Sequence, residues 1–301
     1  MSLDALLFVL LMLALGYGCA RLRLFPDNTA EVLNLFALYL CLPAAVLRFV
    51  PKLQFSADIA VVALVPWLVL ALSVALIVPL ARMLKLRDEE RAVLLLCVPL
   101  GNTSFLGYPL TEALLGRDAL PYAVIYDQFG SFLILTTWGL WILARYGGDA
   151  RPTPMMMLRK VLRFPPFLAL VLALTLMPAE PPALITNALA KLSDTLLPIA
   201  VLAVGLSLKL RLPRDEIAPL GLGLALKLAL LPAAVFALMA LRHDSTTSAA
   251  VSVLETAMPP MITAGALAIS HRLAPSLAAA LVGYGTVLSL VTLPLWAAML
   301  R

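Results

Sequence analysis

Two polar interruptions in otherwise apolar segments carry the side chains best suited to binding a ligand. The first covers residues 101–109, with the sequence GNTSFLGYP, and the second covers residues 255–260, with the sequence ETAMPP. Lipid cannot hydrogen-bond free N–H and C=O groups, so an interrupted helix at membrane depth must bury its main chain or line a wet cavity. Interrupted helices of this kind form the substrate sites of many membrane carriers.

Each interruption also creates an electrostatic site, because it exposes up to about four N–H and four C=O groups at the new helix ends. The N-terminal ends carry partial positive charge, so two of them meeting near the membrane midplane favour an anion even without a buried Arg or Lys. Gly101 and Gly107 allow non-helical dihedral angles. Pro109 and the pair Pro259-Pro260 lack N–H donors and are expected to stop the helical ladder.

Polar and turn-forming residues in and beside the interruptions are the candidates for substrate binding. They are Asn102, Thr103, Ser104, Tyr108, Thr256, Pro259 and Thr263. Their polar groups can bond either a substrate or the freed main chain. The alternative is a structural kink that binds nothing.

Four further polar residues lie inside apolar segments, where a charge is costly and usually faces a cavity or a partner. They are Asp127, Gln128, Lys227 and Glu255. At about 1.5 Å per helical residue, Asp127 and Lys227 both fall near the midplane, which predicts a mutually neutralising pair. Glu255 can take up a proton on one side and release it on the other, which would couple transport to protons. The alternatives are a purely structural ion pair and a Glu255 side chain that only bonds freed N–H groups.

Membrane helices are the elements that must position these residues. Hydrophobic residues make up 62% of the chain and charged residues 13%, which excludes a soluble globular protein. A helical span needs roughly 20 apolar residues, and ten segments qualify: 3–20, 29–50, 58–81, 90–111, 119–144, 160–178, 183–208, 215–241, 246–270 and 275–300. We therefore predict an all-α membrane protein with ten transmembrane helices, of which the fourth and the ninth are broken and cross each other.

The distribution of basic residues predicts the orientation of these helices. Fifteen of the 22 Lys and Arg residues lie in loops after the odd-numbered segments, against five on the opposite side. Because basic loops stay in the cytoplasm, both termini are expected outside, in a multi-pass protein of the inner (cytoplasmic) membrane. The net charge of +5 thus reflects topology and not nucleic-acid binding. The three cysteines lie in apolar runs, so we expect no disulfide, metal site or cofactor.

Short sequence motifs of the first half of the chain recur in the second half. Leu42-Pro43 is echoed by Leu197-Pro198, and Asn102-Thr103 by Glu255-Thr256, with nearly equal offsets. We expect a first five-helix repeat over 1–146, a cytoplasmic connection over 147–158 and a second repeat over 159–301. Since five is odd, the two repeats would have inverted topology, which suits alternating access. Chance recurrence of proline in membrane helices is the alternative reading.

The first interruption resembles the motif Gly-Asn-Thr-Gly-Phe-Leu-Gly-x-Pro of the auxin efflux carrier family, and the second resembles that family's second crossover. The chain departs from the family pattern at Ser104, where Gly is usual, and at Met261, where a small residue is usual. The resemblance implies an elevator-like carrier of small organic anions, such as malonate, malate or auxin-like acids. It also implies a scaffold of spans 1, 2, 6 and 7, expected to form a homodimer, and a transport domain of spans 3–5 and 8–10.

Three other functions are alternatives to an anion carrier. A sodium-coupled symporter of the bile-acid type would have a similar fold, but span 4 lacks an evident cage of acidic ligands. An intramembrane enzyme would need paired Asp, Ser–His or His-rich motifs, and none is evident in the sequence. An anion channel or sensor is the third alternative, against which the duplication and the two broken helices argue.

Overall fold

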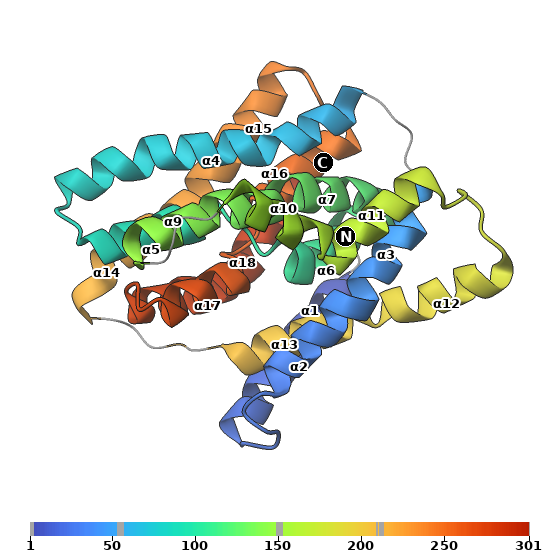
Figure 1. Ribbon diagram of the computed structural model, residues 1–301, viewed down its shortest axis with the longest axis horizontal. Helices are drawn as coiled ribbons and strands as arrows, with labels where there is room; N and C mark the ends of the chain where they lie inside the picture. The colour runs from blue at the N-terminus through green and yellow to red at the C-terminus, as the bar shows by residue number, and fades with distance from the viewer. Residues whose placement is uncertain (1–2, 53–56, 149–152, 209, 211–213, 301) are drawn as a thin grey trace.

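The computed structural model describes residues 3–52, 57–148, 153–208, 210 and 214–300, and all regular elements within them are helical (Figure 1). The helical class is therefore as predicted. Residues 149–152 of the expected connection, and the cations Arg151, Lys209, Arg211 and Arg301, lie outside the described residues.

Helices of the first half follow the expected segments closely. They are α1 (Leu3–Arg21), α2 (Thr29–Phe36), η1 (Ala37–Cys41), α3 (Leu42–Phe49), η2 (Val50–Lys52), α4 (Ala57–Met83), α5 (Asp88–Cys97), η3 (Thr103–Gly107), α6 (Tyr108–Leu115), η4 (Arg117–Ala119), α7 (Leu120–Tyr126), η5 (Asp127–Ser131), α8 (Phe132–Ile134), η6 (Leu135–Gly139) and α9 (Leu140–Tyr146). Several of these elements run on without a break, so that η1 continues α2 and η5 continues α7.

Helices of the second half show the same kind of correspondence. They are α10 (Pro154–Leu162), α11 (Pro165–Thr175), α12 (Ala183–Asp194), α13 (Leu196–Ser207), η7 (Arg214–Glu216), α14 (Ile217–Ala225), η8 (Leu226–Leu230), α15 (Leu231–Leu241), α16 (Thr247–Thr256), α17 (Ile262–Ser270) and α18 (Pro275–Met299). Helix α10 begins at Pro154, inside the segment expected to be a loop, because Thr153 caps it by accepting a hydrogen bond from the Met156 N–H.

Five helical stretches are long and apolar enough to cross a membrane: Thr29–Lys52, Ile59–Met83, Ala183–Ser207, Ile217–Leu241 and Pro275–Met299. Shorter apolar helices cover Leu7–Arg21 and Pro165–Thr175. The chain is thus a multi-pass membrane protein by length and composition, and the arrangement as ten spans in two inverted repeats stays a prediction.

Helices α1, α2, α3, α11, α12 and α13 pack against one another, toward the lower right of Figure 1. Helices α1 and α13 cross closely because Gly16 and Gly205 face each other, and a Cβ on either residue would overlap the opposing main chain. Helix α3 is fixed to α12 by Arg48, whose Nη1 donates to Ser193 Oγ at 2.6 Å and to Asp194 Oδ1 at 2.7 Å. We call these six helices the first helix group.

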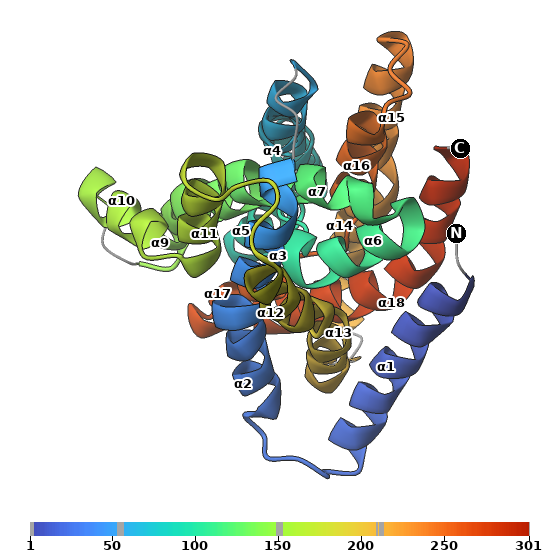
Figure 2. The same cartoon turned by 90° about the vertical axis from the view of Figure 1, so that its right-hand side faces the viewer.

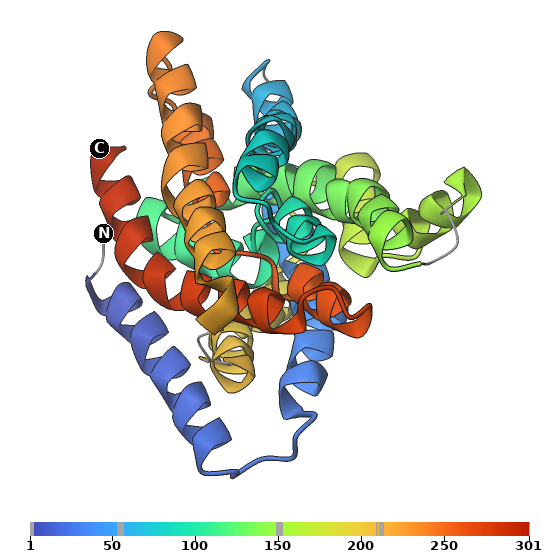
Figure 3. The same cartoon turned by 90° about the vertical axis from the view of Figure 1, so that its left-hand side faces the viewer.

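The remaining long helices, among them α4, α5, α7, α14, α16, α17 and α18, form the second helix group. Within it, α4 packs on α5, α7 and α16, and α18 packs on α14 and α17. Figures 2 and 3 show the two groups from opposite sides, with α1 at the edge and α4 and α15 projecting together. Contacts between the groups include those of α13 with η3 and of α3 with α7. The second group contains both interruptions, so its internal packing determines the geometry of the site.

Three π-helical segments, η1, η3 and η8, each end two residues before a proline. Proline removes the N–H that would bond the carbonyl four residues earlier, and a wider turn accommodates that loss. At η8 the indole Nε1 of Trp296 donates to the Leu228 carbonyl oxygen at 3.0 Å, the acceptor that Pro232 cannot serve. The segments η5 and η8 carry Asp127 and Lys227, so both buried charges lie on widened turns.

Candidate functional site

The two interruptions cross and are joined through their main chains. Gly101 and Pro260 form an isolated antiparallel bridge. The Asn102 N–H donates to the Pro259 carbonyl oxygen at 2.8 Å, and the Met261 N–H donates to the Leu100 carbonyl oxygen at 2.9 Å. Main-chain groups freed by each break are therefore paired by the other break. We call residues 98–107 and 257–261 the crossover.

The ends of four half-helices meet at the crossover. Helices α5 and α16 end there, whereas α6, preceded by η3, and α17 begin there. Helix α5 packs on α17, and α16 packs on α6, so each half-helix contacts a half of the other interrupted span. Two partially positive N-terminal ends thus lie beside two partially negative C-terminal ends. Pro109 does not stop the first half-helix as expected, because it occupies the first turn of α6, where its missing N–H costs nothing.

Asp127 lies 1% exposed in η5 and is surrounded by donors. Its Oδ1 accepts hydrogen bonds from Thr103 Oγ1 and, at 2.7 Å, from Ser104 Oγ. Its Oδ2 accepts from Tyr108 Oη at 3.0 Å and from Gln128 Nε2 at 2.7 Å. Four predicted site residues therefore converge on one carboxylate, which fixes the first interruption to α7 and η5.

Glu255 is fully buried at the end of α16 and has far fewer partners. Its Oε1 accepts one hydrogen bond, from Thr111 Oγ1 at 2.8 Å, and its Oε2 is buried without a partner. The carboxylate lies directly over Gly107, where any Cβ would overlap Oε2. Glycine at this position is what lets the carboxylate reach the crossover.

Lys227 is also buried, at 1% exposure, and its Nζ lies against Gly101 of the first interruption. The expected Asp127–Lys227 ion pair is wrong for this structure: within the described residues, no carboxylate lies within 4.0 Å of Lys227 Nζ. Neutral donors occupy both oxygens of Asp127 instead. Glu255 is the acidic residue near Lys227, since a Cβ on Gly101 would meet both Lys227 Nζ and the Glu255 main-chain oxygen.

Unpaired polar atoms gather around the crossover. The Asn102 amide Nδ2, the Gln128 Oε1 and the Glu255 Oε2 are buried without hydrogen-bond partners. Such groups cost free energy when buried, so they mark a place where a ligand or water would be bound. With Lys227 Nζ beside them, the available partners are two donors and two acceptors, which suit an anion that carries its own polar groups.

Three of the predicted binding residues contribute no side-chain atom to this set of unpaired groups. Thr256 Oγ1 donates to the Ser252 carbonyl oxygen at 2.7 Å and lies 3.0 Å from Tyr126 Oη, so it joins α16 to α7. Thr263 is exposed on α17 and is not among the hydrogen-bond partners of either carboxylate. Pro259 contributes only its main-chain oxygen, through the bond from Asn102.

Thr111 and Gly107 complete the surroundings of Glu255, but neither was predicted from the sequence to contact its carboxylate. A signal for Thr111 exists in the sequence, since it lies four residues after Gly107 and therefore on the same helical face. Within the described residues no group of three His, Cys, Asp or Glu side chains could hold a metal ion.

Comparison with known proteins gives consistent matches over the whole chain. Residues 1–297 match a family model described as a membrane transport protein. An uncharacterized transporter of Methanothermobacter thermautotrophicus is 27% identical over 302 residues, covering 99% of this chain and 98% of its own length. An uncharacterized transporter of Methanocaldococcus jannaschii is 26% identical over 304 residues, covering 98% and 97%.

Proposed function

Because the chain belongs to the membrane transport protein family, that of the auxin efflux carriers, we propose that it is a secondary transporter of small organic anions such as malonate, malate or auxin-like acids. No covalent chemistry is part of this function. The substrate is a mono- or dicarboxylate bound at the crossover and carried across the cytoplasmic membrane, with both chain termini outside.

The observation that carries the proposal is the set of unpaired donors at the crossover. Asn102 Nδ2 is buried without a partner in the first interruption, Lys227 Nζ lies against the preceding Gly101, and the N-terminal ends of α6 and α17 bring partial positive charge to the same crossover. A carboxylate would satisfy these donors and would neutralise Lys227. The hydroxyl of a hydroxy acid such as malate would in addition donate to the oxygen acceptor of Gln128.

Glu255 is the residue that we propose couples transport to protons. With Lys227 and two carboxylates buried together, one bound proton makes the empty site neutral. Asp127 already has four donors, whereas Glu255 has one, so the proton binds at Glu255 Oε2.

We further propose that the second helix group moves as the transport domain and that the first group is its scaffold, in an elevator-type mechanism. In support, the main-chain bonds of the crossover tie both interruptions into one body, and the first group has its own close Gly16–Gly205 contact. A scaffold of this kind would form the interface of a homodimer in the bilayer.

Uptake in proteoliposomes tests the function. Malonate, malate and indole-3-acetate would be offered under an imposed proton gradient, an imposed sodium gradient or neither. We expect saturable uptake of at least one of these acids, driven by the proton gradient. Asn102→Ala should lower uptake about ten-fold, since one hydrogen bond to a charged ligand is worth about 1.5–3 kcal/mol. Glu255→Gln should abolish the dependence on the proton gradient.

Two matched controls exist in the chain. Asn34 also has a buried amide oxygen without a partner, but it lies in α2, far along the chain from the crossover. Glu216, like Glu255, is buried with one oxygen bonded and the other without a partner. Asn34→Ala and Glu216→Gln should therefore leave uptake and its coupling unchanged. Uptake driven by sodium would replace the proton assignment, and uptake unchanged in Asn102→Ala would remove the substrate from the crossover.

A further inference from the structure

A cavity lies outside the crossover, between the two helix groups. Its volume is about 530 Å³, and its walls come from η1, the region from α8 to η6, α10 and the start of α11. Apolar side chains, among them Tyr39, Phe132 and Phe164, form most of the lining. Three cations, Arg159, Lys160 and Arg163, stand along one side of it.

Helix α10 supplies Arg159 and Lys160, and Arg163 is its C-cap residue; the helix is amphipathic. Beside its basic residues it exposes Met155, Leu158 and Leu162, whose exposed fractions are 58%, 50% and 51%. The helix projects from the body of the molecule at the left edge of Figure 2 and the right edge of Figure 3. A short helix with apolar residues exposed beside Lys and Arg is typical of the membrane–water interface.

The three cations differ from the paired cations of the described chain. Arg87 is held between Glu90 and Glu216, and Arg48 is paired with Asp194. Within the described residues, Arg159, Lys160 and Arg163 have no carboxylate within 4.0 Å. Their charge is therefore available to an external anion.

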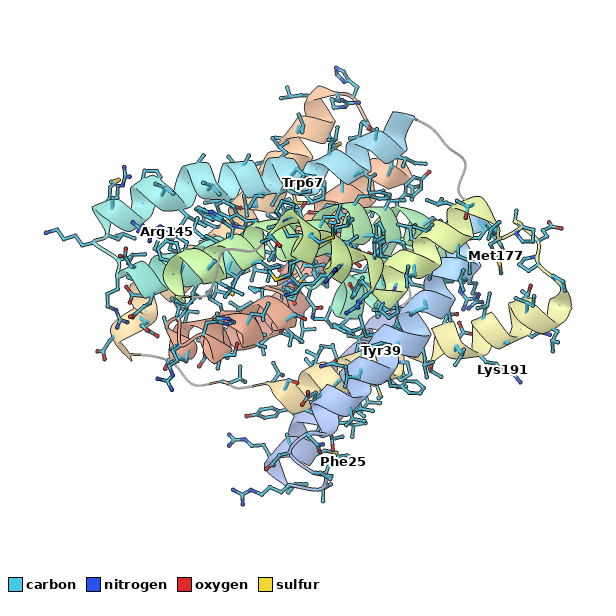
Figure 4. The ribbon with its side chains drawn as sticks, viewed as in Figure 1. Phe25, Tyr39, Trp67, Arg145, Met177 and Lys191 are labelled. Atoms are coloured by element: carbon cyan, nitrogen blue, oxygen red, sulfur yellow. The ribbon has the colours of Figure 1, made fainter. Side chains whose placement is uncertain are left out.

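Figure 4, drawn in the view of Figure 1, labels Tyr39, which is one of the residues that line the cavity. The basic side chains of α10 belong to the loop side that holds most of the Lys and Arg residues, and the positive-inside rule assigns this side to the cytoplasm. Anionic phospholipids give the inner surface of membranes its negative potential, and clusters of Lys and Arg at that depth bind their headgroups.

We propose that this cavity binds one anionic phospholipid, such as phosphatidylglycerol, with its phosphate between Arg159, Lys160 and Arg163 and its acyl chains along Tyr39, Phe132 and Phe164. The apolar wall distinguishes a lipid from a free anion, because a small anion would leave that wall in contact with water. The site does not depend on the substrate or the coupling proposed above.

Native mass spectrometry of the detergent-purified protein tests this site. Phosphatidylglycerol and phosphatidylcholine with identical chains would be added separately, and inorganic phosphate would be added as a competitor. We expect retention of phosphatidylglycerol in preference to phosphatidylcholine, with little competition by phosphate. Arg159→Gln/Arg163→Gln should weaken phosphatidylglycerol binding about ten-fold or more, since each cation near an anionic surface contributes about 1 kcal/mol.

Arg82→Gln/Lys85→Gln is the matched control, because it removes two exposed cations from the same predicted side but outside the cavity. This variant should bind phosphatidylglycerol as the native protein does. Equal losses in both variants would mean only diffuse attraction and would overturn the proposal, as would full retention in both. Effective competition by inorganic phosphate would assign the cations to a free anion instead. All four substituted residues are exposed, and unchanged thermal unfolding would verify that both variants fold.

Discussion

Two buried carboxylates lie beside the crossover, and the chain surrounds them very differently. Asp127 accepts four hydrogen bonds from neighbouring side chains, whereas Glu255 accepts one and leaves an oxygen without a partner. Asp127 uses its hydrogen-bonding capacity on side chains of the protein, so it fixes the geometry of the site. Glu255 keeps one oxygen available to bind a proton or a ligand. Equal burial thus gives no guide to role, but the number of donors around each group does.

The largest effect is expected from removing the saturated carboxylate. Asp127→Ala would leave buried hydroxyls of Thr103 and Tyr108 and the Gln128 amide without an acceptor, at about 1–3 kcal/mol for each unsatisfied group. The free energy of unfolding in detergent, measured by denaturant titration, should fall by about 3 kcal/mol or more. Asp127→Asn keeps one oxygen acceptor and should lose less. A smaller loss in Asp127→Ala than in Glu255→Ala would contradict the comparison.

An intermediate effect is expected from filling the space under Glu255. In Gly107→Ala the new methyl group would overlap Glu255 Oε2, so the carboxylate must leave its position and its bond to Thr111. We expect a loss of about 1–3 kcal/mol, as for other overpacked sites.

The double variant Gly107→Ala/Glu255→Ala separates this contact from a main-chain effect. If the overlap is the cause, the second substitution should recover most of the loss, and the coupling energy follows from the double-mutant cycle. Gly18→Ala is the control, because a Cβ there meets nothing within 4 Å. Additive losses would place the cost in the main chain of η3.

The smallest effect is expected from removing the single donor to Glu255. Thr111→Val keeps the shape of the side chain but deletes the bond to Oε1, and unfolding should become easier by about 1 kcal/mol. Thr286→Val, which deletes a partly buried bond to the Val282 carbonyl oxygen of its own helix, should cost less because that carbonyl keeps its helical partner. Equal losses of unfolding free energy in the two variants would mean that the Thr111–Glu255 bond stabilises the protein no more than a bond within one helix.

Much of this arrangement could be predicted from the sequence, because it follows from local properties. The lengths of the apolar runs predicted the helical segments, and glycine and proline marked both interruptions. Asn102, Thr103, Ser104, Tyr108, Asp127 and Gln128 were identified by being polar where lipid excludes polarity, and they do lie together.

The pairing of these groups could not be predicted, because it depends on how each helix is rotated about its axis. A difference of one residue turns a side chain by about 100°, so depth alone suggested the wrong partner for Asp127. The widened turn η5 adds to this uncertainty, since it shifts all following side chains and has no proline within two residues of its end to announce it. The contact of Glu255 with Gly107 is set by the crossing of distant segments and has no local signal.

The main-chain bonds of the crossover also constrain how the protein is made. Leu100 and Asn102 are synthesised long before their partners Met261 and Pro259, which follow after more than half of the chain. Until the second half arrives, the first break has donors and acceptors with no partner in an environment without water. In the nascent first half these groups must therefore be satisfied by the insertion machinery or by bound water. A fragment ending after α9 should be degraded faster in cells than the full chain. The last helices to be inserted complete the first site to be synthesised.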